Sequence, residues 1–536
     1  MIKKGKLELT WVGKYEEKKI EPRILIEDKS KSYGDPDTEN MLIHGDNLIA
    51  LKALEQDFEG KIKCIYIDPP YNTGSAFEHY DDGLEHSEWL NMMKPRLELL
   101  RNLLRDDGFF CCHIDDSEGH YLKVLLDEVF GRDNYLTTLY IRVRYPDKIL
   151  KADMDFHKEI EQIHVYRKKY GAKPNLVEKD VGYDKYCYYI EEIGVGEKIV
   201  LGGKQVEVFK KNQYRIKKQE GSEYGLKEIW ASGTILDGNS SGRFFRDFLA
   251  GRYLEDGYGV LYKVYGIGDD RFDYRYFTGP KRKGATKGKY YQGVPLAKLN
   301  NGDMKKTSPI NGFYDMAGNF GNCRQEGGVD FRSGKKPEAL IEMILKYFSN
   351  EGDFVLDSFL GSGSTIAVAH KLRRKWIGIE LGNQCYTHCI PRMRRVIDGE
   401  QTGISKNVNW SGGGGFRFFE LAESLLVKNP KLPIYSINPN YTFEMMAEAI
   451  CKIEGFKYNP NGKFHGQSSE KRFIHVTKEF VNSKYVFSLL TELDTTQSLL
   501  IYCTKMQSDI VLPENIEIKK IPKDLLEKCT FESEVR

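Results

Sequence analysis

The residues best suited to chemistry are Asp68-Pro69-Pro70-Tyr71, which follow an apolar run, 64–67. Proline has no N–H group and a fixed φ, so this strand must end in a stiff, extended loop. Asp68 then stands at the carboxyl end of a strand, where open α/β sheets bind their ligands. The Asp68 carboxylate, the Pro69 carbonyl and the Tyr71 ring could hold an amino group and stack the planar ring that carries it.

A second segment predicts a cofactor site. Residues 354–357 predict a strand, 358–365 a glycine-rich turn, and 366–372 a helix. Glycines let the backbone approach a ligand, and a helix N-terminus adds a positive partial charge. A further strand at 375–380 ends in Glu380, and an acid at such a position commonly hydrogen-bonds ribose hydroxyls. The turn lacks the third spaced glycine of the dinucleotide fingerprint.

Together the two segments resemble those of the amino-group DNA methyltransferases. Asp-Pro-Pro-Tyr after an apolar strand resembles their catalytic motif, and Phe-x-Gly-x-Gly resembles their S-adenosylmethionine motif. The catalytic motif precedes the cofactor motif, and most of the chain separates them. This order resembles the β-class, in which a target-recognition insert separates a catalytic half from a cofactor half.

The resemblance implies methyl transfer from S-adenosylmethionine to the N6 amino group of adenine in duplex DNA, without a covalent intermediate. The target base would be flipped out of the helix, at a cost of about a few kcal/mol. Asp68 and the Pro69 carbonyl would accept from the amino group, and Tyr71 would stack on the base, with Pro70 in the same motif. The loop at 75–83 could close over the base or be an ordinary surface loop. The residues implied to bind the cofactor are Asp46, Lys336, Pro337, Asp357, Phe359, Gly361, Gly363, Ser364, Thr365 and Glu380.

Two of these assignments have alternatives. Asp46 could simply cap the helix expected at 48–58. Lys336-Pro337 resembles the family motif that grips the methionine end of the cofactor, but the preceding residues, 331–334, depart from the family pattern.

The elements that must position these residues alternate between strand and helix. This alternation predicts an α/β fold: a Rossmann-like methyltransferase sheet with helices on both faces, a large inserted domain and a small C-terminal α/β domain. The expected strands are 41–47, 61–67, 108–114, 354–357 and 375–380, and the expected helices are 48–58, 89–105, 121–130, 338–347 and 366–372.

The 536 residues divide into five expected parts. These are an N-terminal arm at 1–40, the catalytic half at 41–135, the target-recognition insert at 136–318, the cofactor half at 319–405 and a C-terminal assembly domain at 406–536. The arm could contact DNA or be a variable tail.

The insert is aromatic, basic and glycine-rich, as a nucleic-acid surface would be. Composition alone favours a solvated basic loop, whereas the position between the two motifs favours DNA recognition. The residues expected to contact DNA are Arg275, Lys281, Arg282, Lys283, Lys287 and Lys289.

Composition excludes several other classes. The net charge of +2 gives no global attraction to nucleic acid, and ten scattered cysteines indicate a reducing cytosol. We expect a cytoplasmic protein without a membrane span, and Cys385 and Cys389 as buried structural residues without a metal. The absence of a Gly-Lys-Ser/Thr motif excludes a P-loop motor in this sequence, and the absence of Pro-Cys disfavours C5 methylation of cytosine.

The segment after the cofactor half narrows the resemblance. Four glycines, 412–415, precede Phe416-Arg417-Phe418-Phe419-Glu420-Leu421, which resembles the modification (Mod) subunit of Type III restriction-modification systems. That resemblance implies a homodimer and a separate restriction subunit. The alternatives are a cytosine-N4 methyltransferase, which more often carries Ser at the position of Asp68, a catalytically silent DNA-binding specificity subunit, and an RNA methyltransferase.

Overall fold

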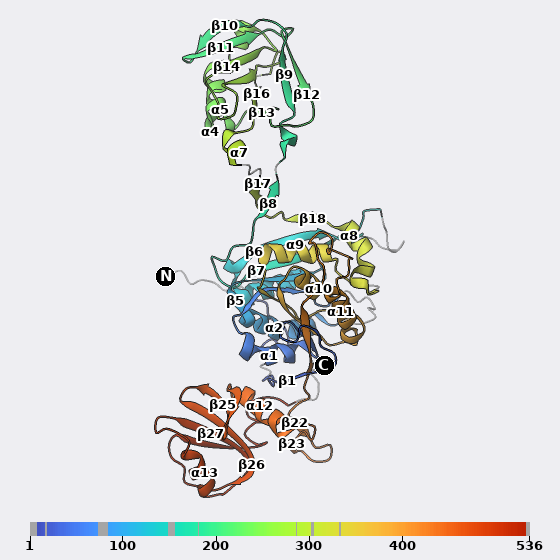
Figure 1. The fold of residues 1–536 in the computed structure, drawn as a ribbon, viewed down its shortest axis with the longest axis vertical. Coiled ribbons are helices and arrows are strands. Elements are labelled where there is room, and N and C mark those ends of the chain that lie inside the picture. Colours follow the sequence, from blue (N-terminus) through green and yellow to red (C-terminus); the bar gives the residue numbers. More distant parts are fainter. Residues whose placement is uncertain are drawn as a thin grey trace. The chain divides into compact units, whose positions relative to one another are not determined.

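The computed structural model describes residues 8–16, 19–72, 84–147, 156–180, 182–285, 287–301, 305–331 and 334–531 (Figure 1). The loop expected at 75–83 lies outside the described residues. The chain forms two compact units, Met1–Asn175 with Asn311–Arg536, and Leu176–Ile310.

An eleven-stranded sheet forms the centre of the first unit. Its order is β1-β21-β3-β20-β19-β4-β5-β7-β6-β18, with β2 paired to β21. The strands from β21 to β5 are parallel, β7 is antiparallel to β5 and β6, and β18 is parallel to β6. The predicted α/β fold class is confirmed. The strands are β1 Leu25–Glu27, β2 Tyr33–Gly34, β3 Met41–His44, β4 Ile62–Ile67, β5 Leu104–Ile114, β6 Tyr135–Arg142, β7 Ile160–Arg167, β18 Phe313–Asp315, β19 Phe354–Asp357, β20 Lys375–Glu380 and β21 Gly415–Leu421.

Helices cover both faces of this sheet. Adjacent strand residues point to opposite faces. Phe110 on β5 stacks on Phe130, with ring centroids 4.7 Å apart, whereas Phe109 contacts Phe348 on the other face at 5.1 Å. Phe130 follows helix α3 and Phe348 ends helix α9. The helices are α1 Asn47–Phe58, α2 His86–Leu103, α3 Gly119–Leu126, α9 Glu338–Phe348, α10 Ser364–Lys371 and α11 Ile390–Ile397.

The central sheet extends beyond the ranges expected from sequence. Strands β6, β7 and β18 fall in the range 136–318 expected for the insert, yet they pair within this sheet, and the separate unit is narrower, 176–310. No described helix intervenes between β6 and β7, so the β–α alternation that marks the domain in the sequence stops before the sheet does. Strand β21, in the range expected for the C-terminal domain, also belongs to the sheet, and β1 and β2 pair with it.

The described part of the N-terminal arm packs on the first unit. The Trp11 indole donates to Asn91 on α2 at 2.7 Å, and the Lys14 ammonium pairs with Glu128 at 2.8 Å. Residues 1–7, 17 and 18 lie outside the described residues.

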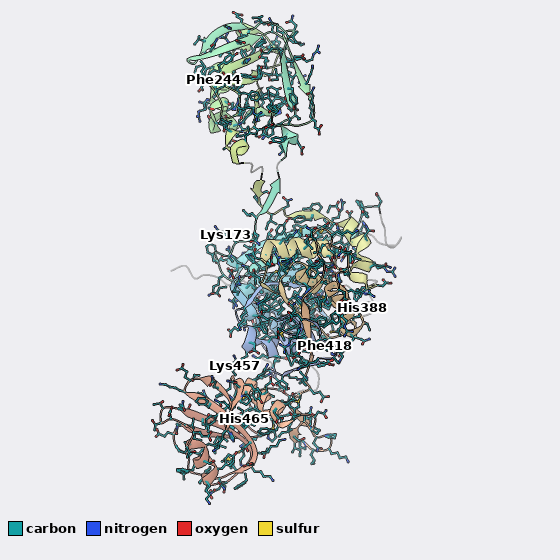
Figure 2. The ribbon with its side chains drawn as sticks, viewed as in Figure 1. Lys173, Phe244, His388, Phe418, Lys457 and His465 are labelled. Carbon is teal, nitrogen blue, oxygen red and sulfur yellow. The ribbon has the colours of Figure 1, made fainter. Side chains whose placement is uncertain are left out.

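The unit Leu176–Ile310 contains a six-stranded antiparallel sheet in the order β10-β11-β14-β15-β16-β13. Phe244, labelled in Figure 2, packs in its core near Phe277. The strands of this unit are β8 Val177–Asp180, β9 Tyr188–Glu192, β10 Glu197–Leu201, β11 Lys204–Phe209, β12 Tyr214–Lys218, β13 Lys227–Ala231, β14 Leu261–Tyr265, β15 Tyr274–Thr278, β16 Gly288–Gln292 and β17 Lys305–Ser308.

The C-terminal residues form a small α/β layer. Helix α12, Phe443–Ile453, packs on a sheet in the order β24-β25-β26-β27-β28, in which β26, β27 and β28 are parallel. Among the helices that the structure describes, none combines the length and hydrophobicity needed to cross a membrane. The strands are β24 Lys457–Asn461, β25 Phe464–Ser469, β26 Arg472–Val481, β27 Ser498–Met506 and β28 Ile516–Lys520.

Candidate active site

Two neighbouring parallel strands bring the two chemical segments together. Strand β4 leads into Asp68, and β19, which ends at Asp357, pairs with β4 so that Leu356 lies opposite Ile65. Because parallel strands end at the same edge of a sheet, the Asp68 loop and the glycine-rich turn lie side by side although the sequence separates them widely. This edge is where open α/β sheets bind ligands.

Both carboxylate oxygens of Asp68 already have partners. Oδ1 accepts the Tyr71 hydroxyl at 2.8 Å, and Oδ2 lies 2.7 Å from the Lys336 ammonium. The Lys336 nitrogen also lies 5.0 Å from the centroid of the Tyr71 ring, within cation–π range. Burial alone would lower the pKa of Lys336, but the nearby carboxylates of Asp68 and Glu161 raise it, so Lys336 is charged.

The loop after β4 is held rigidly. The carbonyl of Pro70 accepts a hydrogen bond from the buried Trp89 indole at 2.8 Å. Asn72 has a φ of +58°, and its side-chain amide donates to the buried Glu118 carboxylate at 2.6 Å. These contacts fix the direction in which Tyr71 leaves the strand.

Sequence reasoning missed a second carboxylate, Glu161 on β7. It accepts from the Tyr71 hydroxyl at 3.1 Å, lies 2.9 Å from His113 Nε2 and 3.9 Å from the Lys336 ammonium. Burial alone would raise the pKa of Glu161, but Lys336, His113 and Tyr71 lower it to about 2. We call Asp68, Tyr71, Glu161 and Lys336 the catalytic cluster.

His113 at the end of β5 is a close neighbour of Glu161, although its Nε2 makes no hydrogen bond to any described residue. Its Nδ1 lies 2.8 Å from the hydroxyl of buried Tyr66 on β4. The only sequence signal for His113 is its place near the end of a predicted strand. Glu161 has none, because the antiparallel pairing of β7 with β5 is not visible in the sequence.

The glycine-rich turn is fixed by two acids. Asp357 accepts from the Phe359 amide at 2.9 Å and from the Thr365 hydroxyl at 2.6 Å, and Glu380 accepts from the Gly361 amide at 2.6 Å. Burial raises the pKa of Asp357 to about 7, although these two donors oppose the shift. Both acids therefore hold the turn in place by accepting hydrogen bonds from its residues.

The glycine-rich turn has backbone conformations that favour glycine. Gly361 and Gly363 have φ of +57° and +78°, a region in which a side chain would be strained. Helix α10 begins at Ser364, directly after this bare backbone. A Cβ added at Gly363 would point toward Cys389 Sγ, 3.5 Å away, so the positive φ is what favours glycine there.

A second group of buried charges lies behind the turn. The Glu338 carboxylate pairs with the Lys371 ammonium and with the Arg392 guanidinium, each at 2.7 Å, and all three side chains are fully buried. Arg392 also donates to the Ser362 carbonyl at 3.2 Å and the Ser364 hydroxyl at 2.9 Å. We call Glu338, Lys371 and Arg392 the scaffold cluster.

Ser364 connects this turn to the catalytic cluster. Its hydroxyl donates to the backbone carbonyl of Lys336 at 2.8 Å. Pro337 follows Lys336 and is the residue that precedes α9. The segment 336–338 thus links the glycine-rich turn to Asp68.

Asp46 caps a helix, as the alternative interpretation held. Its carboxylate accepts from the Leu48 and Ile49 amides at 2.9 and 3.2 Å, and it pairs with Arg96 at 3.2 Å. Asn47 donates to the Ser358 carbonyl at 2.7 Å, so the start of α1 contacts the segment before the glycines.

A cavity of about 380 Å³ adjoins the catalytic cluster. Glu161 and Lys336 line it, together with Tyr145, Phe320 and Phe331. Arg144, Arg324 and Lys335 also line it, so the cavity combines aromatic side chains with a mainly cationic set of charges.

Comparison with known proteins identifies the family. A sequence model described as DNA methylase (N6_N4_Mtase) matches residues 62–390. The chain belongs to this DNA methylase family.

Relatives of this DNA methylase include Type III modification subunits. The chain is 35% identical over 471 residues to the probable type III restriction-modification enzyme HindVI Mod subunit of Haemophilus influenzae, and the match covers 83% of this chain and 61% of that protein. It is 27% identical over 436 residues to the EcoPI Mod subunit of Escherichia phage P1, covering 70% and 62%. The chain thus spans less than two thirds of the length of either relative.

A solved structure also matches weakly. The PvuII DNA methyltransferase (cytosine-N4-specific) is 13% identical with a TM-score of 0.34, covering 69% of this chain and 91% of that one.

The basic residues expected to contact DNA separate into two groups in the methylase. Lys281, Arg282, Lys283 and Lys287 are exposed in the loop between β15 and β16. Arg275 is only 4% exposed, pairs with Asp270 at 2.7 Å and donates to Ser241. Lys289 pairs with Glu228 at 2.7 Å and lies 4.3 Å from the Trp230 ring centroid. The first group is accessible to a ligand, whereas Arg275 stabilises the unit from inside.

The cysteines of the methylase are all buried, and the Cys389 thiol donates to the Gly361 carbonyl at 3.2 Å. Within the described residues, no cluster of His, Cys, Asp or Glu could hold a metal ion.

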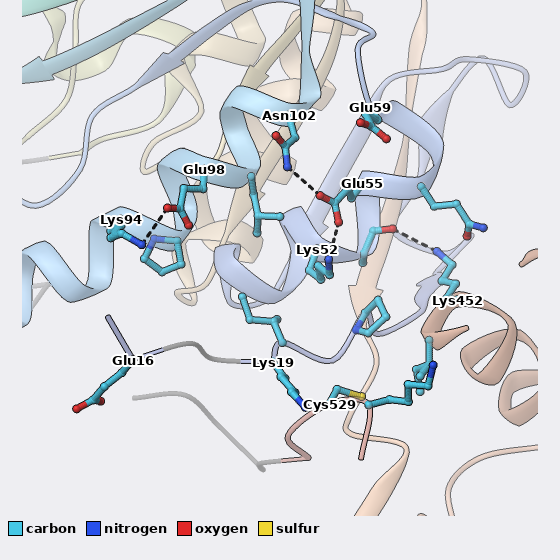
Figure 3. Close-up of a pocket in the computed structure, with 18 of the residues that line it drawn as sticks. Glu16, Lys19, Lys52, Glu55, Glu59, Lys94, Glu98, Asn102, Lys452 and Cys529 are labelled. Atoms are coloured by element: carbon cyan, nitrogen blue, oxygen red, sulfur yellow. Dashed lines mark hydrogen bonds and ion pairs between the residues drawn. The ribbon is translucent and has the colours of Figure 1, made fainter. Parts of the chain in front are cut away.

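A larger cavity of about 1100 Å³ lies away from this sheet edge, among the N-terminal arm, α1, α2 and C-terminal residues (Figure 3). Charges lining it pair with one another: Lys52 with Glu55 at 2.6 Å and Lys94 with Glu98 at 2.9 Å. Among its described lining residues, none offers a group suited to methyl transfer.

Proposed function

We propose that this chain transfers a methyl group from S-adenosylmethionine to the N6 amino group of adenine in duplex DNA. The observation that carries the proposal is the adjacency of the Asp68 loop and the glycine-rich turn on β4 and β19. Asp68, which can accept from an amino group, and the glycine-rich turn, where we place the cofactor, thus meet at one sheet edge.

The chain's own residues would position the reactants. Gly361, Gly363 and the start of α10 would hold the cofactor, which supplies an electrophilic methyl group, and Glu380 and Lys336-Pro337 flank that place. Asp68 would accept a hydrogen bond from the amino group of the flipped adenine and direct its lone pair. The ammonium of Lys336, 2.7 Å from Asp68 Oδ2, would fix the orientation of that side chain in this role. The rate would come from positioning and electrostatics.

The unit Leu176–Ile310 would bind the DNA. Its four exposed cations between β15 and β16 can reach phosphates, which position a protein on the duplex. Trp230, 54% exposed beside Lys289, offers an aromatic face nearby in the same unit.

The similarity to Mod subunits supports a role as the modification and specificity subunit of a Type III-like system. A second copy of the chain and a separate restriction subunit would be its partners, and the cytoplasm its location.

The decisive experiment is methyl transfer from labelled S-adenosylmethionine to plasmid DNA, followed by nucleoside analysis. N6-methyladenine is the expected product. N4-methylcytosine would overturn the choice of base, and label found only in RNA would overturn the choice of substrate. Cofactor-dependent DNA binding without any labelled product would overturn the enzymatic proposal.

A further inference from the structure

The catalytic cluster poses a problem for the incoming amino group. Each oxygen of Asp68 already accepts a hydrogen bond or pairs with a cation, from Tyr71 at 2.8 Å and Lys336 at 2.7 Å. An amino group that binds Asp68 in line with the proposed function must share an oxygen with one of these donors or displace that donor. A buried donor left without an acceptor would destabilise the complex with the substrate.

Tyr71 has a second acceptor already in reach. Its hydroxyl has one proton but lies 2.8 Å from Asp68 Oδ1 and 3.1 Å from Glu161 Oε2. A phenol hydroxyl is a single donor, so it serves one of these oxygens at a time. Rotation about the C–O bond moves the hydrogen from Asp68 to Glu161 without moving the ring.

Glu161 is built to stay in place for this exchange. His113 lies 2.9 Å from the same Oε2 atom, and Tyr66 fixes the other side of the His113 ring. The Lys336 ammonium lies 2.7 Å from Asp68 and 3.9 Å from Glu161, so it is near both carboxylates. If Asp68 turns to the substrate, Tyr71 keeps a buried acceptor in Glu161, and Lys336 keeps an ion pair with Glu161 at 3.9 Å.

We propose that Glu161 is a positioning residue that receives the Tyr71 hydroxyl when the target amino group binds Asp68. This inference rests on the proposed function and adds to it a residue outside the Asp-Pro-Pro-Tyr motif. No covalent bond changes in the exchange. The two carboxylates alternate as acceptors of one hydrogen.

The test is a double-mutant comparison of methyl transfer. Glu161→Gln, which keeps the shape but removes the charge, should lower kcat about 10- to 100-fold, with little change in KM for DNA or cofactor. In the Tyr71→Phe background, where no hydroxyl remains to be received, Glu161→Gln should lower kcat less than about threefold.

A matched control tests for a mere charge effect. Glu159→Gln removes a carboxylate two residues before Glu161. This carboxylate pairs with Arg142 at 2.6 Å and not with Tyr71. It should leave kcat within about twofold of wild type. If Glu161→Gln does not fold, Glu161→Asp replaces it in the same comparison. Aspartate keeps the negative charge near His113 and Lys336, but its shorter side chain moves the carboxylate oxygen away from Tyr71.

Two outcomes would overturn the exchange. One is that Glu161→Gln lowers kcat by the same factor in the wild-type background and in the Tyr71→Phe background. The other is an effect of Glu161→Gln that is confined to KM. A wild-type chain that transfers no methyl group would overturn the proposed function itself, and with it this inference, so the two failures are distinguishable.

Discussion

The catalytic cluster and the scaffold cluster are both groups of buried charges, but the scaffold side chains are fully buried, whereas two side chains of the catalytic cluster line a cavity. In the scaffold cluster, Glu338 joins two cations and every member is fully buried. In the catalytic cluster, two carboxylates share Tyr71 and Lys336, and Glu161 and Lys336 line a cavity. Fully buried pairs stabilise a turn, whereas charges that line a cavity can exchange a partner with a ligand.

Replacing Asp68 should have the largest effect on activity and separate the two clusters by function. Asp68→Ala removes the acceptor for the amino group and should lower methyl transfer by about 10³-fold or more. DNA binding should change little, and the free energy of unfolding should fall less than in Arg392→Met, because Lys336 keeps the Glu161 carboxylate 3.9 Å away. Rate assays and denaturant unfolding check both. Asp106→Ala, at an exposed residue paired with Lys169, is the control and should be active. Near-normal rates in Asp68→Ala would contradict the assignment.

Replacing Arg392 should show the opposite pattern. Arg392→Met leaves one oxygen of buried Glu338 without its cation and should cost about 3–5 kcal/mol in the free energy of unfolding. Urea unfolding measures this loss. Arg132→Met, at a residue whose side chain is 79% exposed and pairs with Asp127, should cost less than about 1 kcal/mol. If Arg392→Met lost activity at unchanged stability, the scaffold cluster would not be a purely structural group and the two clusters would not differ in function.

A third group of charges, the four exposed cations between β15 and β16, lies on the surface of the unit Leu176–Ile310. Changing Lys281, Arg282, Lys283 and Lys287 together to glutamine should weaken DNA binding about tenfold or more. It should also reduce the salt dependence of binding, by about 0.9 in slope for each phosphate that is no longer neutralised. Binding titrations at several salt concentrations check this. The same change at Lys210, Lys211, Lys217 and Lys218 removes equal charge elsewhere in the unit, and an equal weakening there would contradict a role specific to the β15–β16 loop.

The last comparison concerns Asp357, a single buried acid with neutral donors. Burial raises its pKa from 3.8 to about 7 in the folded chain. Between about pH 4 and pH 7 the unfolded chain releases the proton that the folded chain retains, so the stability contributed by Asp357 is full below pH 4 and is lost by about pH 7. The free energy of unfolding of wild type minus that of Asp357→Asn should therefore fall as pH rises through this range. A difference independent of pH would contradict the burial of an ionisable group.

The sequence could predict what local patterns determine. Asp68 at a strand end, the glycines at 361 and 363, and the alternation of strands and helices all follow from residues close together in the chain. Their convergence at one edge could be expected because parallel strands share an edge.

What the sequence could not predict depends on long-range pairing. Glu161 reaches Tyr71 only because β7 runs antiparallel to β5, and nothing near residue 161 indicates this pairing. Arg275 stands in a run of basic residues, yet its partner Asp270 and the fold of the unit bury it. The sequence predicts a boundary near 136, where the helical patterns cease, but sheets continue without helices when their strands are antiparallel.

Strands β8 and β17 pair antiparallel, Val177 opposite Ser308 and Asp180 opposite Lys305. The chain therefore enters and leaves the unit Leu176–Ile310 through one two-stranded ribbon. All strands of the eleven-stranded sheet come from outside that range, so every pairing in it survives if the intervening segment is exchanged. In evolutionary terms the unit could be exchanged as a whole, and under the proposed function one recombination event across this ribbon would give the same chemistry a new DNA target.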